Sequence, residues 1–410
     1  MDSFIIEGGR RLYGKVHVSG AKNSSLPILF ATLLCRGVSK IRHLPDITDV
    51  NIALHIIEDL GAKIEKKGDL CEIDTRHLCY RECAPELVCR IRASTYLIGS
   101  SLARFGRVSL CSFGGCNFSP RPIDMHLSCA ERFGARYDTL GMTCERLRPT
   151  DIHFRRSSVG ATVNALLLAS ATEGVSRIYG GAREPHVFTL VEFLRSAGAE
   201  IFADSECFTV RGGELSGGVI DVPGDMIEAG TFLYAGLLTG GEVEVAGGVP
   251  EELSTFIDPL IPHGVRASLS CESVCLSGRL GSPTDIVCAP YPAYPTDMQP
   301  ILAPVLAASA GGSITDTVFP ERFGYLAELA SLGVEFERRE RGGVIHPSRL
   351  RGGRCYARDL RGGASSVLAA LAAEGESEIL CAEVVSRGYE SFVEKLTALG
   401  ANIRYQRNTV

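Results

Sequence analysis

The chain has 410 residues, of which 45% are hydrophobic and 22% charged, and it carries a formal net charge of −6. This composition excludes a disordered chain, and the length predicts two domains of about 200 residues each. The acidic balance excludes a broad nucleic-acid-binding face, so an anionic ligand must be met by a local cluster of Arg and Lys.

Membrane insertion and export are not expected from the sequence. No uncharged apolar run reaches the roughly 18 residues of a membrane span, and the N-terminus lacks a basic region followed by an apolar stretch. The 15 cysteines are therefore expected to be reduced thiols in a cytoplasmic protein, most of them small buried hydrophobes. Cys79-x3-Cys83 and Cys271-x3-Cys275 have no second pair or His partner at zinc spacing, so no metal site is expected.

An internal repeat of about 67 residues occurs six times along the chain. Each copy has a helix end rich in small residues, a glycine and a short alternating strand, and the glycines are Gly37, Gly106, Gly174, Gly241, Gly312 and Gly375. A second marker, an apolar residue, Gly and a small residue before another strand, recurs in step at Gly61, Gly134, Gly198, Gly264, Gly333 and Gly400. Coincidental glycine punctuation does not explain two markers in step.

The first copy shows how one unit is built. An apolar helix face is predicted from the helical spacing of Leu26, Leu29, Phe30, Leu33 and Leu34. The glycine of the first marker is expected to end this helix as a left-handed residue. A second, amphipathic helix is predicted from Ile52, Leu54, Ile57 and Leu60, and in the last copy from Phe392, Leu396 and Leu399. Three such units per domain could pack around a pseudo-threefold axis.

Two segments open helices with features of an anion site. In Ser19-Gly20-Ala21-Lys22-Asn23, the helix start presents free N–H groups and a positive dipole end, and Lys22 could hold a phosphate. The small residues of segment 157–162 would let a diphosphate approach the backbone. A solvated lysine and an ordinary N-cap are the respective alternatives.

The segment 114–124 has two glycines before Cys116 and two prolines around Arg121, which predicts an exposed loop. A thiol on such a loop beside a cation can be reactive. An unreactive loop cysteine is the alternative.

Asp297 lies in the segment Tyr294-Pro295-Thr296-Asp297-Met298-Gln299, which opens an apolar helix. Its default role is a helix cap. A carboxylate held there could instead accept a proton from a sugar hydroxyl.

Several arginines occupy corresponding turns between a strand and a helix of the repeat, in the set Arg92, Arg322, Arg361 and Arg387. Arginines gathered at equivalent turns of an acidic protein indicate binding of a phosphate or carboxylate, which Arg grips in a bidentate manner. For any single one, a surface salt bridge is the alternative.

Together these motifs resemble the UDP-N-acetylglucosamine 1-carboxyvinyltransferase family from about residue 4 to residue 404. The matching motifs are SGAKN, GGC followed by RPxDxH (Cys116, Arg121, Asp124, His126), SVGAT, AREP, IExGTF, PTDMQ, TVFxxRF, DLR and RGYE. The Cys loop and PTDMQ separate this family from the related shikimate-pathway enolpyruvyl transferase.

The resemblance implies an α/β fold of two inside-out barrel domains, each of three pseudo-symmetric repeats, like EPSP synthase. Residues 1–21 and 226–410 would form domain II, and 22–225 would form domain I with the Cys loop. The implied reaction transfers the enolpyruvyl group of phosphoenolpyruvate to the 3-hydroxyl of UDP-N-acetylglucosamine and releases phosphate, the first committed step of peptidoglycan synthesis. Neither cofactor nor metal is implied.

The resemblance also implies residue roles. Cys116 would be the general acid, able to form a covalent phosphoenolpyruvate adduct and the target of fosfomycin in the family, and Asp297 the base. Lys22 and Arg387 would complete the catalytic set. Phosphoenolpyruvate would contact Lys22, Asn23, Arg121, Arg361 and Arg387. The UDP-sugar would contact Asn23, Arg92, Arg121, Pro122, Ile123, Asp124, Met125, Arg156, Ser158, Val159, Gly160, Asp297 and Val318.

The chain departs from the family pattern at a few positions. Arg156 replaces a usual Lys, Thr48 a basic residue, Met226 a cation, and 384–386 a His-Ile-Asp segment. These departures keep a second hypothesis open, a non-catalytic paralogue that binds a UDP-sugar and regulates a partner. A shikimate 3-phosphate transferase is the third, but it would not need the Cys loop.

Overall fold

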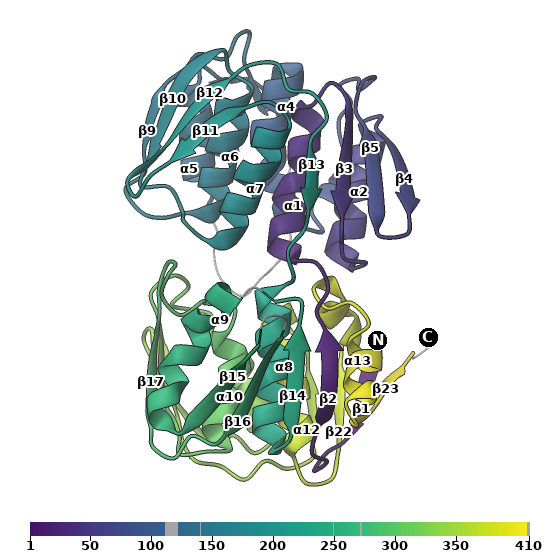
Figure 1. Ribbon diagram of the computed structural model, residues 1–410, viewed down its shortest axis with the longest axis vertical. Coiled ribbons are helices and arrows are strands. Elements are labelled where there is room, and N and C mark those ends of the chain that lie inside the picture. Colours follow the sequence, from purple (N-terminus) through teal and green to yellow (C-terminus); the bar gives the residue numbers. More distant parts are fainter. Residues whose placement is uncertain (111–121, 140, 249, 271–272, 408–410) are drawn as a thin grey trace. The chain divides into compact units, whose positions relative to one another are not determined.

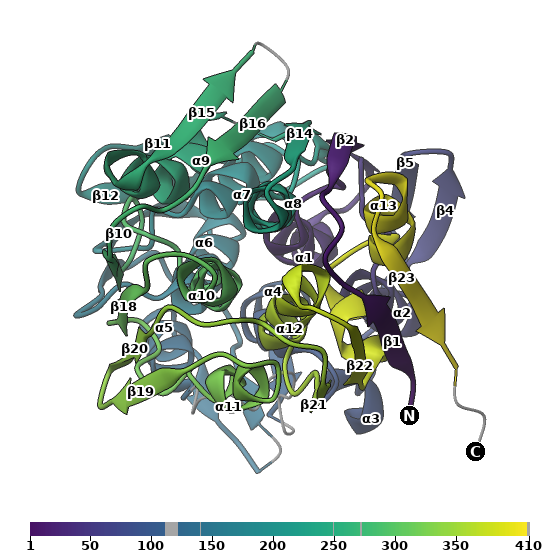
Figure 2. The same ribbon diagram turned by 90° about the horizontal axis from the view of Figure 1, so that it is seen from below.

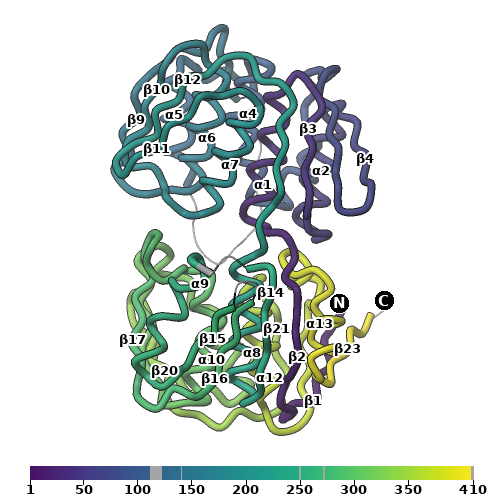
Figure 3. Tube along the Cα trace, viewed as in Figure 1, coloured from purple at the N-terminus to yellow at the C-terminus, as the bar shows by residue number. Residues whose placement is uncertain are grey.

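The computed structural model describes residues 1–110, 122–139, 141–248, 250–270 and 273–407, and it divides into two compact units. Unit 1 contains Met1–Ser19 and the described chain from Gly224 onward, and unit 2 contains the described residues from Gly20 to Pro223. The chain thus starts in unit 1, passes into unit 2 and returns, a course that Figure 3 traces by colour.

Unit 1 holds three four-stranded sheets. The first has the order β21-β22-β1-β23 (Arg354–Tyr356, Glu376–Leu380, Ser3–Glu7, Asn402–Gln406). The second is β15-β16-β14-β2 (Val265–Leu269, Ser273–Gly278, Glu242–Ala246, Tyr13–His17). The third is β17-β18-β20-β19 (Thr284–Cys288, Gly312–Asp316, Gly342–Ile345, Phe336–Arg339).

Unit 2 repeats this plan (Figure 1). Its sheets are β13-β3-β5-β4 (Val219–Asp221, Val38–Arg42, Leu70–Asp74, Lys63–Lys67) and β11-β12-β10-β9 (Glu200–Ala203, Cys207–Gly212, Gly174–Tyr179, Asp151–His153). A third sheet, β6-β8-β7, has three strands among the described residues (Arg107–Ser109, Gly141–Thr143, Arg136–Tyr137). Each four-stranded sheet has one parallel edge pair and two antiparallel pairs.

The six-fold repeat predicted from the glycine markers is confirmed. The strands at the first marker are β3, β6, β10, β14, β18 and β22, and those after the second are β4, β7, β11, β15, β19 and β23. All six glycines of the second marker have a positive φ, between 91° and 116°. Glycine adopts this conformation without the steric cost that a Cβ would bring, so it ends the helix and starts the strand.

Three helices in each unit are buried on nearly all sides, and the sheets lie outside them, as Figure 2 shows for unit 1. They are α8, α10 and α12 in unit 1 (Met226–Thr239, Gln299–Ala307, Leu360–Ala372) and α1, α4 and α6 in unit 2 (Lys22–Ala31, Leu97–Phe105, Val159–Ser170). The predicted apolar face of the first helix is buried, and the rest of that helix is buried as well. Of α1, only Asn23 is even partly exposed, because the helix fills the centre of its unit.

The second helix of each repeat packs by one face, as predicted. These helices are α2, α5, α7, α9, α11 and α13 (Thr48–Asp59, Asp124–Arg132, Pro185–Ser196, Pro250–Ile257, Tyr325–Ala330, Phe392–Ala398). On α2 and just beyond it, Ile52, Leu54, Ile57 and Leu60 are buried, whereas His55 and Glu58 are exposed. A further short helix is α3 (Pro85–Val88).

The left-handed role expected for the first-marker glycines holds for some copies only. Gly106 caps α4 with φ 71°. Gly37 has no positive φ, because α1 continues as a 3₁₀ turn, Thr32–Leu34, that ends before it. A glycine is needed there for another reason, because the backbone of Gly217 comes so close that a Cβ on Gly37 would lie 2.7 Å from its nitrogen. At the fourth copy the cap of α8 is Gly240, one residue early.

Each crossing between units follows an edge strand that stays in its own unit. β2, the last strand before the first crossing, pairs with β14 of unit 1, and β13, the last strand before the second, pairs with β3 of unit 2. Gly20 follows the first crossing, and a Cβ there would lie 1.8 Å from the carbonyl oxygen of His43. Only glycine fits this position. No helix within the described ranges is long and apolar enough for a bilayer crossing.

Candidate active site

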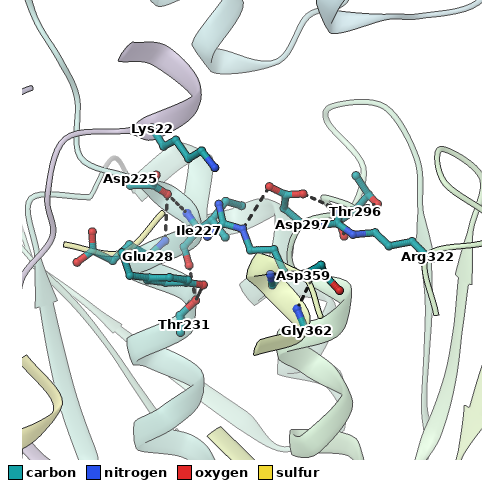
Figure 4. Close-up of polar contacts among 12 residues, drawn as sticks. Lys22, Asp225, Ile227, Glu228, Thr231, Thr296, Asp297, Arg322, Asp359 and Gly362 are labelled. Carbon is teal, nitrogen blue, oxygen red and sulfur yellow. Dashed lines mark hydrogen bonds and ion pairs between the residues drawn. The ribbon is translucent and has the colours of Figure 1, made fainter. Parts of the chain in front are cut away.

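Asp297 of unit 1 lies between two buried arginines (Figure 4). Its Oδ1 accepts a hydrogen bond from Arg322 Nη1 at 2.6 Å, and its Oδ2 one from Arg361 Nε at 3.4 Å. The default role of helix cap is wrong, because α10 begins at Gln299 with Met298 as its N-cap residue. The carboxylate is instead held by tertiary contacts.

The first turn of α12 places Arg361. Asp359 caps the helix by accepting hydrogen bonds from the N–H groups of Arg361 and Gly362 at 3.1 and 3.0 Å (Figure 4). The guanidinium lies 5.2 Å from the ring centre of Tyr389, and the Tyr389 hydroxyl lies 2.8 Å from that of Thr231 on α8. The residue is only 1% exposed, yet its Nη1 has no hydrogen-bond partner among the described residues. A buried charged donor left in this way is available to an anionic ligand.

Asp316 joins the PTDMQ segment to the predicted pocket residue Val318. Its Oδ2 accepts a 2.5 Å hydrogen bond from the Thr296 hydroxyl, and its Oδ1 accepts from the N–H groups of Val318 and Phe319, both at 2.8 Å. This completely buried carboxylate fixes the turn after β18 beside Asp297.

Lys22 of unit 2 is not a solvated lysine. It is only 9% exposed, and its Nζ forms a 2.9 Å ion pair with Asp49 on α2, which is also buried. Asn23, the next residue of α1, is half-buried. The ion pair holds the Lys22 ammonium at a defined place in unit 2.

His126 and Asn164 tie the predicted UDP-sugar segments of unit 2 together. Asn164 accepts from the Gly99 N–H at 2.6 Å through Oδ1, which turns its Nδ2 donors towards Thr95 O and His126 Nδ1, 3.1 and 2.7 Å away. His126 therefore accepts at Nδ1. Burial, with a smaller effect of Arg92, lowers its pKa to about 4, so the ring is neutral at pH 7. A Cβ on Gly160 would lie 2.7 Å from this ring.

The N-terminus of α6 carries the predicted diphosphate segment. Ser158 is an ordinary N-cap, since its Oγ accepts from the Ala161 N–H at 3.4 Å, and Val159 and Gly160 follow with partial exposure. The exposed Arg156 lies 4.0 Å from Asp124 and 3.4 Å from the sulfur of Met125. Arg156 thus connects the loop before α6 with the first turn of α5.

The remaining predicted residues are spread over both units. Arg92 begins a 3₁₀ turn and is partly exposed, Pro122 is exposed and Ile123 half-buried before α5, and Arg387 ends a 3₁₀ turn in unit 1. Cys116 and Arg121 lie outside the described residues. The twelve described cysteines are free, and seven of them are buried.

The family model described as EPSP synthase (3-phosphoshikimate 1-carboxyvinyltransferase) matches residues 6–396. The chain belongs to this family. Within it, the similar curated relatives are named UDP-N-acetylglucosamine 1-carboxyvinyltransferase. One from Caldanaerobacter subterraneus is 40% identical over 98% of this chain and 99% of its own, and one from Chlorobaculum parvum is 38% identical over 99% of each. The expected family is confirmed.

Solved structures support the same fold. The enolpyruvyl transferase NikO from Streptomyces tendae has a TM-score of 0.88 at 27% identity, with complete coverage of both chains. An EPSP synthase from Acinetobacter baumannii has a TM-score of 0.74 at 19% identity, over 99% of this chain and all of the other, and shows the shared fold alone. The expected EPSP synthase-like fold is confirmed.

Sequence reasoning left several polar residues of these clusters out of the predicted site. Arg322 was grouped with the other arginines but given no role, and Asp49, Tyr389 and Asp316 were not singled out. Each acts through a partner on a different segment, which no spacing along the chain indicates. The available signal was that Arg322 is itself the arginine of the TVFxxRF motif.

Proposed function

We propose that the chain transfers the enolpyruvyl group of phosphoenolpyruvate to the 3-hydroxyl of UDP-N-acetylglucosamine and releases phosphate. The observation that carries this proposal is Arg361, whose buried guanidinium has one nitrogen without a partner among the described residues. A dense anion such as phosphoenolpyruvate would satisfy it in a bidentate manner. The relatives named for this activity support the acceptor sugar.

Asp297 suits the role of base because one of its two cationic contacts can be taken over by substrate. Arg322 contacts one oxygen of the carboxylate and Arg361 the other. An incoming phosphoenolpyruvate anion would compete for Arg361, and Asp297 would then be free to accept the proton of the sugar hydroxyl. In the proposal, Cys116 protonates the methylene carbon of phosphoenolpyruvate.

The other proposed contacts divide between the two anionic substrates. Lys22, Arg121 and Arg387 hold the phosphoenolpyruvate charge that develops during addition, and Asn23 contacts both substrates. The diphosphate meets the N–H groups at the start of α6, Ser158 to Gly160, where the helix dipole favours an anion. The remaining UDP-sugar contacts are Arg92, Pro122, Ile123, Asp124, Met125, Arg156 and Val318.

Addition and elimination require only proton transfers and charge stabilisation, so the proposal includes no cofactor and no metal. It places the reaction in the cytoplasm. Free thiols, which the described cysteines all are, suit a reducing compartment.

Phosphate release tests the proposal. The protein is incubated with phosphoenolpyruvate and UDP-N-acetylglucosamine, and in parallel with phosphoenolpyruvate and shikimate 3-phosphate. Release with the UDP-sugar alone is expected. Release only with shikimate 3-phosphate would assign the other activity of the family, and UDP-sugar binding without release would assign a non-catalytic regulator.

A further inference from the structure

Ser19, the last residue of unit 1 before the first crossing, has all three of its polar groups bonded within unit 1. Its N–H donates to Glu228 Oε2 at 3.1 Å, and its hydroxyl accepts from Lys395 Nζ at 2.7 Å. Its carbonyl oxygen accepts from the N–H of Asp225 at 2.9 Å. A residue in a connecting segment that uses every polar group is held in one conformation.

The two residues that bind Ser19 through their side chains, Glu228 and Lys395, also form a buried ion pair with each other. Lys395 Nζ on α13 lies 2.5 Å from Glu228 Oε1 on α8, and the two side chains are 18% and 2% exposed. Asp225 fixes the start of α8 by accepting from the Ile227 and Glu228 N–H groups at 2.8 and 3.0 Å (Figure 4). We call Ser19, Glu228 and Lys395 the Ser19 anchor.

Stability does not account for this ion pair. Burial raises the pKa of Glu228 from 4.5 to about 7, against the opposing effect of Lys395 and with a further rise from Asp225. A carboxyl whose pKa is raised by folding favours the folded state when protonated, so ionising it costs stability as pH rises from 4.5 through 7. A buried ion pair is in general weak evidence for stability, and here the pair fixes Ser19.

The Ser19 anchor is continuous with the arginine cluster of unit 1. Glu228 and Thr231 are three residues apart on α8 and so lie on one face of the helix. Glu228 holds Lys395, and Thr231 holds the hydroxyl of Tyr389, whose ring lies against Arg361. The segment from Tyr389 to α13 is thereby attached to α8 at two points.

On the other side of the crossing, the chain is held just as firmly within unit 2. The tight approach of Gly20 to the carbonyl of His43 leaves no room for a side chain. The Ala21 N–H donates to the carbonyl of Pro223 at 2.7 Å, and α1 begins at Lys22.

We propose that Glu228 and Lys395 are positioning residues for the transfer reaction, because they fix Ser19 and hence the point from which the Lys22–Asn23 segment starts. This inference rests on the proposed function, in which neither Glu228 nor Lys395 contacts a substrate. Loosening the anchor should therefore lower kcat, with little effect on the KM of either substrate, since misplaced groups slow the chemical step.

Two variants test the anchor. Lys395→Met removes the cation, and Ser19→Ala removes only the hydroxyl acceptor, so it leaves the buried ion pair intact if the first variant folds poorly. Each is expected to lower kcat on the order of tenfold, with KM changed by less than about twofold. Lys15→Met is the matched control, because Lys15 lies on β2 and pairs with Glu244 at 3.0 Å but is well exposed.

Amide hydrogen exchange gives a readout that does not need activity. In the substrate-free protein, both variants should speed exchange in the peptide containing Ser19, relative to Lys15→Met, because the anchor that shields this amide is weakened. Unchanged exchange and unchanged kcat in Ser19→Ala and Lys395→Met, or a rise in KM alone, would overturn the inference. If the wild-type protein releases no phosphate, the proposed function fails, and faster exchange then supports only the anchor.

Discussion

Arg322 Nη1 and Asp297 Oδ1 lie 2.6 Å apart in unit 1, and the two side chains are 4% and 27% exposed, respectively. The backbone of Arg322 is fixed as well, because its carbonyl oxygen accepts a hydrogen bond from Gln299 Nε2 at 2.8 Å. Gln299 is held in turn by the Tyr325 hydroxyl, which donates to its Oε1 at 2.6 Å. One oxygen of Asp297 is thus fixed by a rigid partner, while the other meets Arg361 at a looser 3.4 Å. The weaker contact is the one that an anionic substrate would replace.

Asp297→Asn should reduce both turnover and stability. Without its charge, Arg322 and Arg361 lose the carboxylate that contacts them both, and breaking a buried ion pair costs about 3 kcal/mol. Loss of the base should lower kcat roughly 10²- to 10⁴-fold. Denaturant unfolding and phosphate release measure the two effects. A variant with normal turnover would exclude Asp297 as the base.

Arg361→Gln should abolish stabilisation by anions. Phosphoenolpyruvate at saturating concentration is expected to raise the melting temperature of the wild type, because it binds the folded state alone. The variant should show little or no rise. Arg358→Gln is the control, since Arg358 lies three residues away and pairs with Glu328, but its side chain is 70% exposed. Equal shifts in both variants would remove Arg361 from the anion site.

The repeat could be predicted because its signals are local. Gly61 and its five counterparts have a positive φ, and because glycine is the residue that adopts this conformation without steric cost, its presence in the sequence indicates the turn directly. The alternating strand that follows each glycine is equally local. The pairing of β2 with β14 and of β13 with β3 was not predictable, because each partner lies some two hundred residues away and the sequence of neither strand indicates it.

The candidate site shows the same division. Asp297 was identified through its motif, but its default capping role was wrong because two arginines from distant segments outweigh a local cap. The Lys22 motif predicted a phosphate contact or a solvated side chain, and the solvated side chain is wrong because Asp49 of α2 forms a buried ion pair with it. Long-range ion pairs of this kind depend on packing that spacing along the chain does not encode.

Cys116 is predicted to be the reactive thiol. Cys116→Ser should abolish or cripple turnover, because a serine hydroxyl is a far weaker acid, while Cys116→Asp should retain some activity and escape alkylation by fosfomycin. Mass spectrometry of the treated proteins measures the adduct. Cys89, which is exposed, provides a control through Cys89→Ser, which should be alkylated at Cys116 like the wild type. Normal alkylation of Cys116→Asp would place the reactive thiol elsewhere.

His126 should make the stability of the protein fall in mild acid. Its folded pKa of about 4 lies below the ordinary value of 6.5, so the unfolded chain binds more protons between these two values and stability is lost as pH falls through this window. The full effect is on the order of 3 kcal/mol. The main physical cause is burial of the ring, with a smaller effect of Arg92, and the Asn164 amide, whose donor faces His126 Nδ1, leaves no acceptor there for a second proton.

The measurement is urea unfolding between pH 7 and pH 4.5 for three proteins. The wild type and His55→Gln, which alters an exposed histidine of the same unit, should show the same loss. His126→Asn, whose carbonyl oxygen can accept from Asn164 without titrating, should be less stable at pH 7 because it leaves space beside Gly160, but it should lose less stability on acidification. An identical pH dependence in His126→Asn would show that the buried, neutral ring of His126 does not cause the loss of stability in mild acid.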